Sequence, residues 1–279
     1  MKKIIYICLV LLPFMFSGCK DYLDVSNAGQ SDDAFVMSSP SEAFKALSWV
    51  YAEYRTNAAA GGNYNWQDPL GSDAEYMSEY PSVNNVIARL QPGATTVNTD
   101  MVIYNSLNVA LARATRIADL IAAKAEYKTD AAGSAATSWT QLYGEAKTLR
   151  AYLAWELVRH FGDVPYGYEN QVVSTYTLTS RFEIIDKIIA DIKAVEGKMY
   201  VLGQGGITAE RISRTYANAL LGEIALHTGS WQTIRTDIKG LYGAVTFDTK
   251  GTDDGTCVYA RRKDYMDYIK MAEQYLGNA

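Results

Sequence analysis

The stretch from Gly144 to Tyr166, GEAKTLRAYLAWELVRHFGDVPY, limits the possible fold more than any other part of the chain. Apolar residues recur in and just before it at spacings of three and four, which places them on one face of a helix. Aromatic residues widen this stripe, so both flanks of the helix are expected to pack. Gly162 ends the helix and Pro165 prevents it from resuming. The face consists of Leu142, Ala146, Leu149, Leu153 and Leu157, and the aromatic residues are Tyr152, Trp155 and Phe161.

Charged residues on this helix are more plausible as structural locks than as ligand groups. Glu145, Lys147, Arg150 and Glu156 interrupt the apolar pattern, and Arg159 and Asp163 lie at the end of the helix and in its exit turn. We expect Arg150, Arg159 and Asp163 to hold the helix and its exit turn in place.

Other segments also have helical patterns, so the sequence predicts an all-α, or mostly α, chain. Two long consecutive helices are expected to form an antiparallel pair. The segment from Leu241 to Tyr259 is rich in Gly, Thr and Asp and has short β-branched runs, and it is predicted to be an insertion rather than core. A loop is predicted from Asp130 to Thr137. The additional helices are predicted to start after Ser39, and to run over Thr99 to Tyr127, Ser180 to Glu196, Thr208 to Thr228, and Asp264 to Leu276.

The N-terminus has the pattern of a lipoprotein signal. Two lysines precede an apolar run from Ile4 to Phe16, which is too short to span a membrane and typical of a signal peptide. Small residues then lead to Cys19, a candidate for lipid attachment; the alternative is an ordinary secretory signal with an incidental cysteine. The predicted organisation is therefore a signal peptide over 1–18, a lipid-anchored tether over 19–36, and a helical domain over 37–279.

The cysteine count agrees with this organisation. Of the three cysteines, Cys8 would leave with the signal and Cys19 would carry the lipid, so Cys257 alone could not form an intramolecular disulfide. Cys257 lies in a polar loop with no nearby histidine to activate it, and a catalytic role is not expected.

The loop from Gly61 to Asp73 holds the candidate ligand-binding residues. Exposed rings can pack on the C–H faces of a sugar, and amide side chains can bridge its hydroxyl groups. The alternative is that the aromatic rings pack beneath the loop and hold it in place, and the residues alone do not decide between the two. The candidates are Tyr64, Asn65, Trp66, Asp68 and Asp73.

Composition and missing motifs argue against several functions. A formal net charge of -5 does not suggest a nucleic-acid partner. Adjacent acids such as Asp253 and Asp254 are usually solvated, and His160 and His227 lie near predicted helix ends, where a histidine is favoured by the helix dipole. No phosphate loop, metalloprotease motif or calcium loop is present, so we expect no catalytic residue, cofactor or metal.

Three motifs together resemble the SusD/RagB family of outer-membrane lipoproteins. A-x-x-L-R-A-x-x-x-x-x-L-V-R-x-F-G-D-V-P, from Ala146 to Pro165, is similar to the signature helix of that family. C-x-x-[FY]-L-D, starting at Cys19, resembles the start of its mature proteins. A-x-x-L-L-x-x-I-A-L-x-x-G-x-W, from Ala217 to Trp231, is similar to the first helix of a tetratricopeptide unit.

The resemblance implies a fold and a function. It implies a tetratricopeptide-like helical-repeat scaffold that corresponds to the N-terminal half of the family fold, and it favours the ligand-binding interpretation of Tyr64 to Asp73. The implied function is non-catalytic binding of oligosaccharides at the cell surface, in the outer membrane through a lipid anchor, and delivery to a SusC-like TonB-dependent transporter. The alternatives are a purely protein-interacting subunit of that transporter, or a protein that handles peptide rather than glycan.

Overall fold

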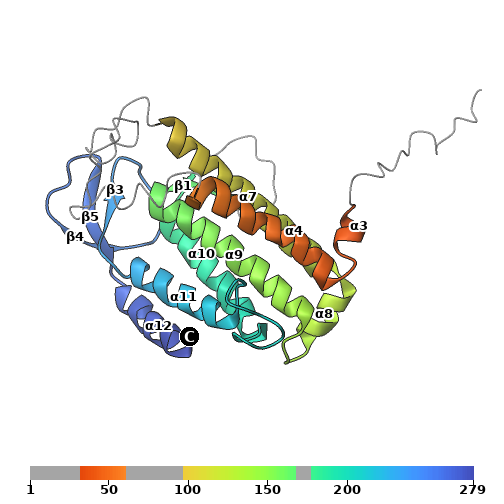
Figure 1. The fold of residues 1–279 in the computed structure, drawn as a ribbon. Coiled ribbons are helices and arrows are strands. Elements are labelled where there is room, and N and C mark those ends of the chain that lie inside the picture. Colours follow the sequence, from red (N-terminus) through yellow and green to blue (C-terminus); the bar gives the residue numbers. More distant parts are fainter. Residues whose placement is uncertain (1–31, 61–96, 168–176) are drawn as a thin grey trace, which may run out of the picture. The chain divides into compact units, whose positions relative to one another are not determined.

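A computed structural model describes residues 32–60, 97–167 and 177–279 (Figure 1). The chain divides into two compact units, Met1–Val36 and Met37–Ala279. The short helix α3 (Asp33–Val36) belongs to the first unit, and all the other described helices and strands belong to the second. None of the described helices is both long and apolar enough to cross a membrane.

The second unit is built mainly from helices, which confirms the predicted fold class. Each helix packs against one that precedes or follows it in the chain, so that α7, α9, α10, α11 and α12 lie next to one another in that order, with α4 against α7 and α9 (Figure 1). The elements are α4 (Pro40–Glu53), a π-helix η2 (Tyr54–Ala60), α7 (Val97–Ala123), α8 (Ala125–Ala132), α9 (Ser138–Phe161), α10 (Arg181–Val195), a 3₁₀ helix η3 (Glu196–Lys198), α11 (Arg214–Thr228) and α12 (Tyr265–Asn278).

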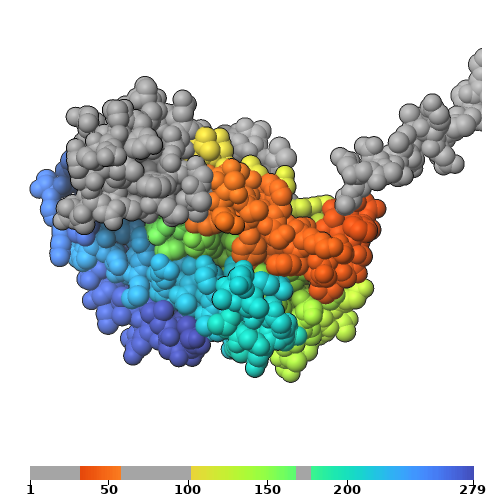
Figure 2. Space-filling model, in the orientation of Figure 1, coloured from red at the N-terminus to blue at the C-terminus, as the bar shows by residue number. Residues whose placement is uncertain are grey.

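The central helix is α9, and it is buried as its sequence predicts. Its leucine face is fully inside the unit, and Trp155 is only 3% exposed. In the space-filling view α4 (orange) and α11 (blue) flank α9 (green), which reaches this face only as a strip (Figure 2). The helix begins with a capping box between Thr137 and Thr140 and ends at Gly162, whose N–H donates to the carbonyl of Val158. The caps fix both ends of the helix.

Two predicted helix boundaries were wrong. The helix predicted to run to Tyr127 breaks at Lys124, and α8 occupies part of the predicted loop after Asp130. Contacts with α9 favour this arrangement, because the Lys124 ammonium lies 5.2 Å from the ring centroid of Trp139 and α8 packs along the same helix. The helix predicted from Thr208 begins only at Arg214, because the Ser213 side chain caps it.

The C-terminal part of the unit contains a small antiparallel sheet. Its strands β3 (Gln232–Arg235), β4 (Phe247–Lys250) and β5 (Cys257–Arg262) lie in the order β3-β5-β4. A second pairing, β1 (Val164–Pro165) with β2 (Leu178–Thr179), joins the exit turn of α9 to the start of α10.

This sheet corrects the prediction that Leu241 to Tyr259 is an insertion outside the core. The inner face of the sheet carries Ile234, Val258 and Ala260, which form a hydrophobic cluster with Phe182 of α10. Phe182 is 1% exposed, and the rings of Tyr242 and Phe247 pack against it. The segment therefore contributes to the core, because alternate residues of its strands face α10.

Candidate functional site

The residues that the sequence singles out for function lie outside the described part of the chain. This holds for the lipidation candidate Cys19 and for the ligand-binding candidates Tyr64, Asn65, Trp66, Asp68 and Asp73. Their roles remain predictions.

The outer face of the sheet presents a different set of exposed side chains. Residues of β5 alternate in burial, so that Val258, Ala260 and Arg262 point inward, while Tyr259 is 48% exposed. In register, Tyr259 pairs with Thr233 of β3 on one side and with Lys250 of β4 on the other. Directly opposed residues in an antiparallel sheet place their side chains on the same face. Thr233, Tyr259 and Lys250 therefore form a row across the three strands.

A stack of side chains extends this row. Trp231, which immediately precedes β3, stacks on Tyr259 with 5.5 Å between ring centroids and 24° between ring planes. The guanidinium carbon of Arg261 lies 4.9 Å from the centroid of Trp231 and 3.5 Å from that of Tyr265. We call this surface the aromatic platform and define it as Trp231, Thr233, Lys250, Tyr259 and Arg261.

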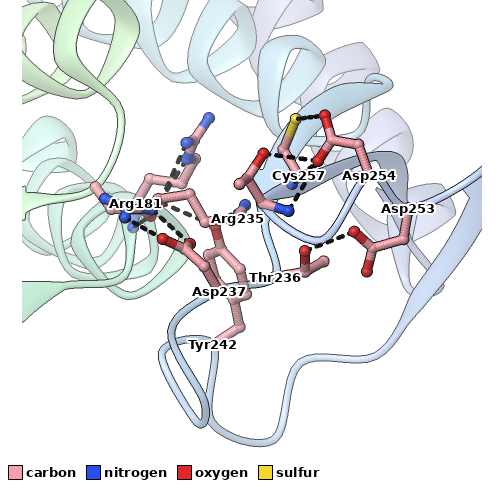
Figure 3. Close-up of polar contacts among 10 residues, drawn as sticks. Arg181, Arg235, Thr236, Asp237, Tyr242, Asp253, Asp254 and Cys257 are labelled. Atoms are coloured by element: carbon pink, nitrogen blue, oxygen red, sulfur yellow. Dashed lines mark hydrogen bonds and ion pairs between the residues drawn. The ribbon is translucent and has the colours of Figure 1, made fainter.

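A polar network centred on the buried carboxylate of Asp163 fixes the sheet to the helices. The Asp163 carboxylate, in the exit turn of α9, accepts hydrogen bonds from the backbone N–H and guanidinium of Arg181, at the start of α10. It also accepts one from the Tyr242 hydroxyl at 2.8 Å, and that hydroxyl in turn accepts from the N–H of Arg235 in β3 (Figure 3). Burial and the Asp163 carboxylate raise the pKa of Tyr242 to about 12. The exit turn, α10 and β3 are thereby joined through one carboxylate.

The loop before β5 is held by its own aspartates. The Asp254 carboxylate accepts from the hydroxyl and N–H of Thr256 and from the N–H of Cys257 (Figure 3). These hydrogen bonds, led by that from the Thr256 hydroxyl, hold the pKa of Asp254 well below its usual range. Asp253 accepts from the Thr236 hydroxyl at the end of β3. Both carboxylates accept hydrogen bonds that stabilise the turn, which is an ordinary role for adjacent acids in a polar loop.

Cavities elsewhere in the unit have charged side chains in their linings. One of about 560 Å³ lies between α10 and the loop from Gly240 to Val245, with Glu183 and Asp186 in its lining. Another, of about 250 Å³, is lined by Lys147 and Asp191, which form an ion pair with 2.7 Å between nitrogen and oxygen. Among the described residues no group of three histidine, cysteine or acidic side chains could hold a metal ion.

Sequence reasoning missed the aromatic platform. In the sequence, Trp231 ends the repeat motif and Tyr259 ends a polar segment predicted to lie outside the core. The available signal was the short apolar run from Cys257 to Ala260, with a β-branched and an aromatic residue, which is consistent with a strand. Which residues of β3 and β4 would join Tyr259 depended on the pairing register.

Comparisons with known proteins place the fold. No family model matches the sequence, and no curated protein matches it. Solved structures do match, among them a SusD homolog from Bacteroides thetaiotaomicron, with a TM-score of 0.56 and 21% identity over 68% of this chain and 36% of that one. Surface glycan-binding protein A from Bacteroides fluxus matches with a TM-score of 0.55 and 21% identity, and a laminarin-binding SusD-like protein with 0.51 and 17%.

Each of the latter two matches covers 68% of this chain and 40% of the other, so this chain spans about two fifths of the length of these solved proteins. The agreement extends over a majority of the chain and recurs in several structures at low sequence identity. The helical unit described here therefore has the fold of the SusD-like proteins.

Proposed function

We propose that this chain is a non-catalytic glycan-binding lipoprotein of the outer membrane. It binds oligosaccharides at the cell surface and passes them to a TonB-dependent transporter. The observation that carries the proposal is the fold, which is shared with a surface glycan-binding protein and a laminarin-binding protein. The aromatic platform supports it, because the exposed ring of Tyr259, beside hydroxyl and cationic groups, can pack on the C–H face of a sugar while the polar groups hydrogen-bond its edge.

The expected affinity is built from several weak contacts. An aromatic contact contributes about 0.5–1.5 kcal/mol beyond the area that it buries. Loss of one ring should weaken binding without abolishing it. Two aromatic regions are available for this role, the platform at Trp231 and Tyr259 and the predicted loop at Tyr64 and Trp66.

Calorimetric titration of the full chain against a panel of neutral and acidic oligosaccharides tests the binding function. We expect Trp231→Ala and Trp66→Ala each to weaken binding of a ligand that the parent chain binds. Tyr216→Ala is the matched control, because Tyr216 is 40% exposed but lies on α11, away from the sheet. Unchanged affinity in either tryptophan variant would remove that residue from the site.

Two further measurements test the anchor and the absence of catalysis. Cys19→Ser should move the protein from the membrane fraction to the soluble fraction, because a lipid-anchored chain needs its acylated cysteine. Incubation with a bound oligosaccharide should return that oligosaccharide intact by mass spectrometry, and cleavage would contradict the proposal. Purification with a transporter but no binding to any glycan would favour a protein-interaction subunit instead.

A further inference from the structure

We infer that the aromatic platform selects acidic oligosaccharides, those that carry a carboxylate or a sulfate group. This inference rests on the proposed function and adds the ligand class of one site. It comes from the two cations of the platform, Lys250 and Arg261. Within the described residues they lack the close carboxylate partners that Arg235 and Arg262 have.

The first observation is the geometry of the row. Thr233, Tyr259 and Lys250 lie on three adjacent strands in direct register. Strands in a sheet are about 4.8 Å apart, so the backbones of Thr233 and Lys250 lie about 10 Å apart, on either side of Tyr259. The Lys250 side chain reaches back across this row to the ring of Trp231, so its cation lies beside the stacked rings of Trp231 and Tyr259.

The second observation is the state of Lys250. Its side chain is exposed, and its ammonium lies 4.4 Å from the ring centroid of Trp231. Within the described residues no carboxylate lies at ion-pair distance from it. A cation held beside an aromatic face without a counter-charge keeps its hydrogen-bond donors for a ligand.

Arg261 gives a third observation. Its nearest carboxylate, that of Asp248, is 3.8 Å away, at the outer limit of an ion pair, and its Nε is buried with no hydrogen-bond partner among the described residues. The neighbouring arginines differ, because Arg235 forks onto Asp237 and Arg262 onto Asp264 through two nitrogens each.

The contrast indicates where a negative ligand group would bind. Arg235 and Arg262 each pair with a carboxylate through two nitrogens, whereas within the described residues Lys250 has no carboxylate partner and Arg261 has only the long contact to Asp248. The chain as a whole has a formal charge of -5, so a positive spot on the platform runs against its general character. A neutral sugar would leave the Lys250 ammonium without an anionic partner, and an acidic sugar would supply one.

The inference is tested by comparing ligands on the full chain. Calorimetry would use oligogalacturonides, which carry carboxylates, carrageenan oligosaccharides, which carry sulfates, and laminarin oligosaccharides, which are neutral. We expect at least one acidic series to bind more tightly than the neutral one. Its affinity should fall as the salt concentration is raised from roughly 50 to 300 mM, because salt screens the attraction between the ligand's anionic groups and the platform. The acidic series that binds identifies carboxylate or sulfate as the recognised group.

The variant Lys250→Gln should lose this preference, with about two- to fivefold weaker binding of the acidic ligand, the range expected for one exposed charge pair. Lys250→Arg should retain it. Lys263→Gln, which removes an exposed cation just beyond β5, is the matched control and should bind as the parent does.

The outcomes separate the two proposals. Equal affinity for acidic and neutral ligands, or an acidic preference that persists in Lys250→Gln, would overturn the charge inference while leaving glycan binding intact. Failure to bind any oligosaccharide would overturn the proposed function, and the inference with it. Circular dichroism and melting temperature of each variant show that an altered affinity does not come from unfolding.

Discussion

Gly162 occupies a backbone conformation that other residues adopt only with strain, at φ 71° and ψ -125°. A Cβ at this position would lie 2.7 Å from a guanidinium nitrogen of Arg181, which pairs with Asp163. We expect Gly162→Ala to lower the free energy of unfolding by about 1–3 kcal/mol, as measured by urea denaturation. Gly197→Ala is the control, because a Cβ there meets no atom within 4 Å. Equal stability of the two variants would contradict the strain argument.

His227 is expected to make stability depend on pH. Burial, followed by the charges of Arg159 and Arg181, lowers the pKa of His227 in the folded chain. In the unfolded chain its pKa is about 6.5. The unfolded state therefore binds more protons just below that pH, so stability falls as pH drops from about 6.5 towards the lowered folded value.

Urea denaturation between pH 5 and pH 8 measures this dependence. The variant His227→Gln should show a shallower loss of stability over the acidic part of that range. An unchanged slope in the variant would show that His227 does not contribute to it.

The partners of individual charges could not be predicted from the sequence. Arg150 and Asp163 were predicted to lock α9 and its exit turn, and they do, through Asp191 and Arg181 of α10. Arg159 instead pairs with Glu156 of its own helix. The role follows from a charge on a buried helix, but the identity of the partner depends on which helix packs beside it.

At the scale of elements, Phe182 attaches the sheet to α10. Its ring contacts the inner face of the sheet and the rings of Tyr242 and Phe247. We expect Phe182→Ala to cost about 3–5 kcal/mol and to leave the sheet less protected than the helices. Amide hydrogen exchange of β5 measures that local effect.

Ile188→Ala is the control for this prediction. Ile188 is fully buried in the same helix but lies outside the cluster beneath the sheet. It should lower overall stability by about 2–5 kcal/mol without singling out β5. Equal loss of β5 protection in both variants would show that Phe182 has no special part in holding the sheet.

The ends of the helices show where signals in the nearby sequence are enough to predict a boundary. The Ser39 cap, the Ser180 cap and the Gly162 stop each act within a few residues, and the structure has all three. The break at Lys124 and the late start of α11 at Arg214 are different. Contacts with α9 set the break at Lys124, whereas the start of α11 is set by the Ser213 cap, a local signal that a periodicity of apolar residues does not contain.

At the scale of the molecule, residues from Met37 to Ala279 form one compact unit. The helices and the sheet share a boundary at Phe182 and the polar network at Asp163, so we expect them to unfold together. Far-UV circular dichroism, which reports the helices, and near-UV circular dichroism, which reports the packed aromatic rings, should give the same urea midpoint. Separate midpoints would show that the sheet is an independent unit.

The sequence by itself determined the helical scaffold and its resemblance to SusD-like proteins. Periodicity, caps and stops lie within short stretches, and the signature from Ala146 to Pro165 is contained in one helix and its turn. Only the tertiary structure decided the aromatic platform. Trp231, Lys250 and Tyr259 meet because three strands pair in a particular register, and register is fixed by packing on Phe182 and by long-range hydrogen bonds rather than by any local pattern.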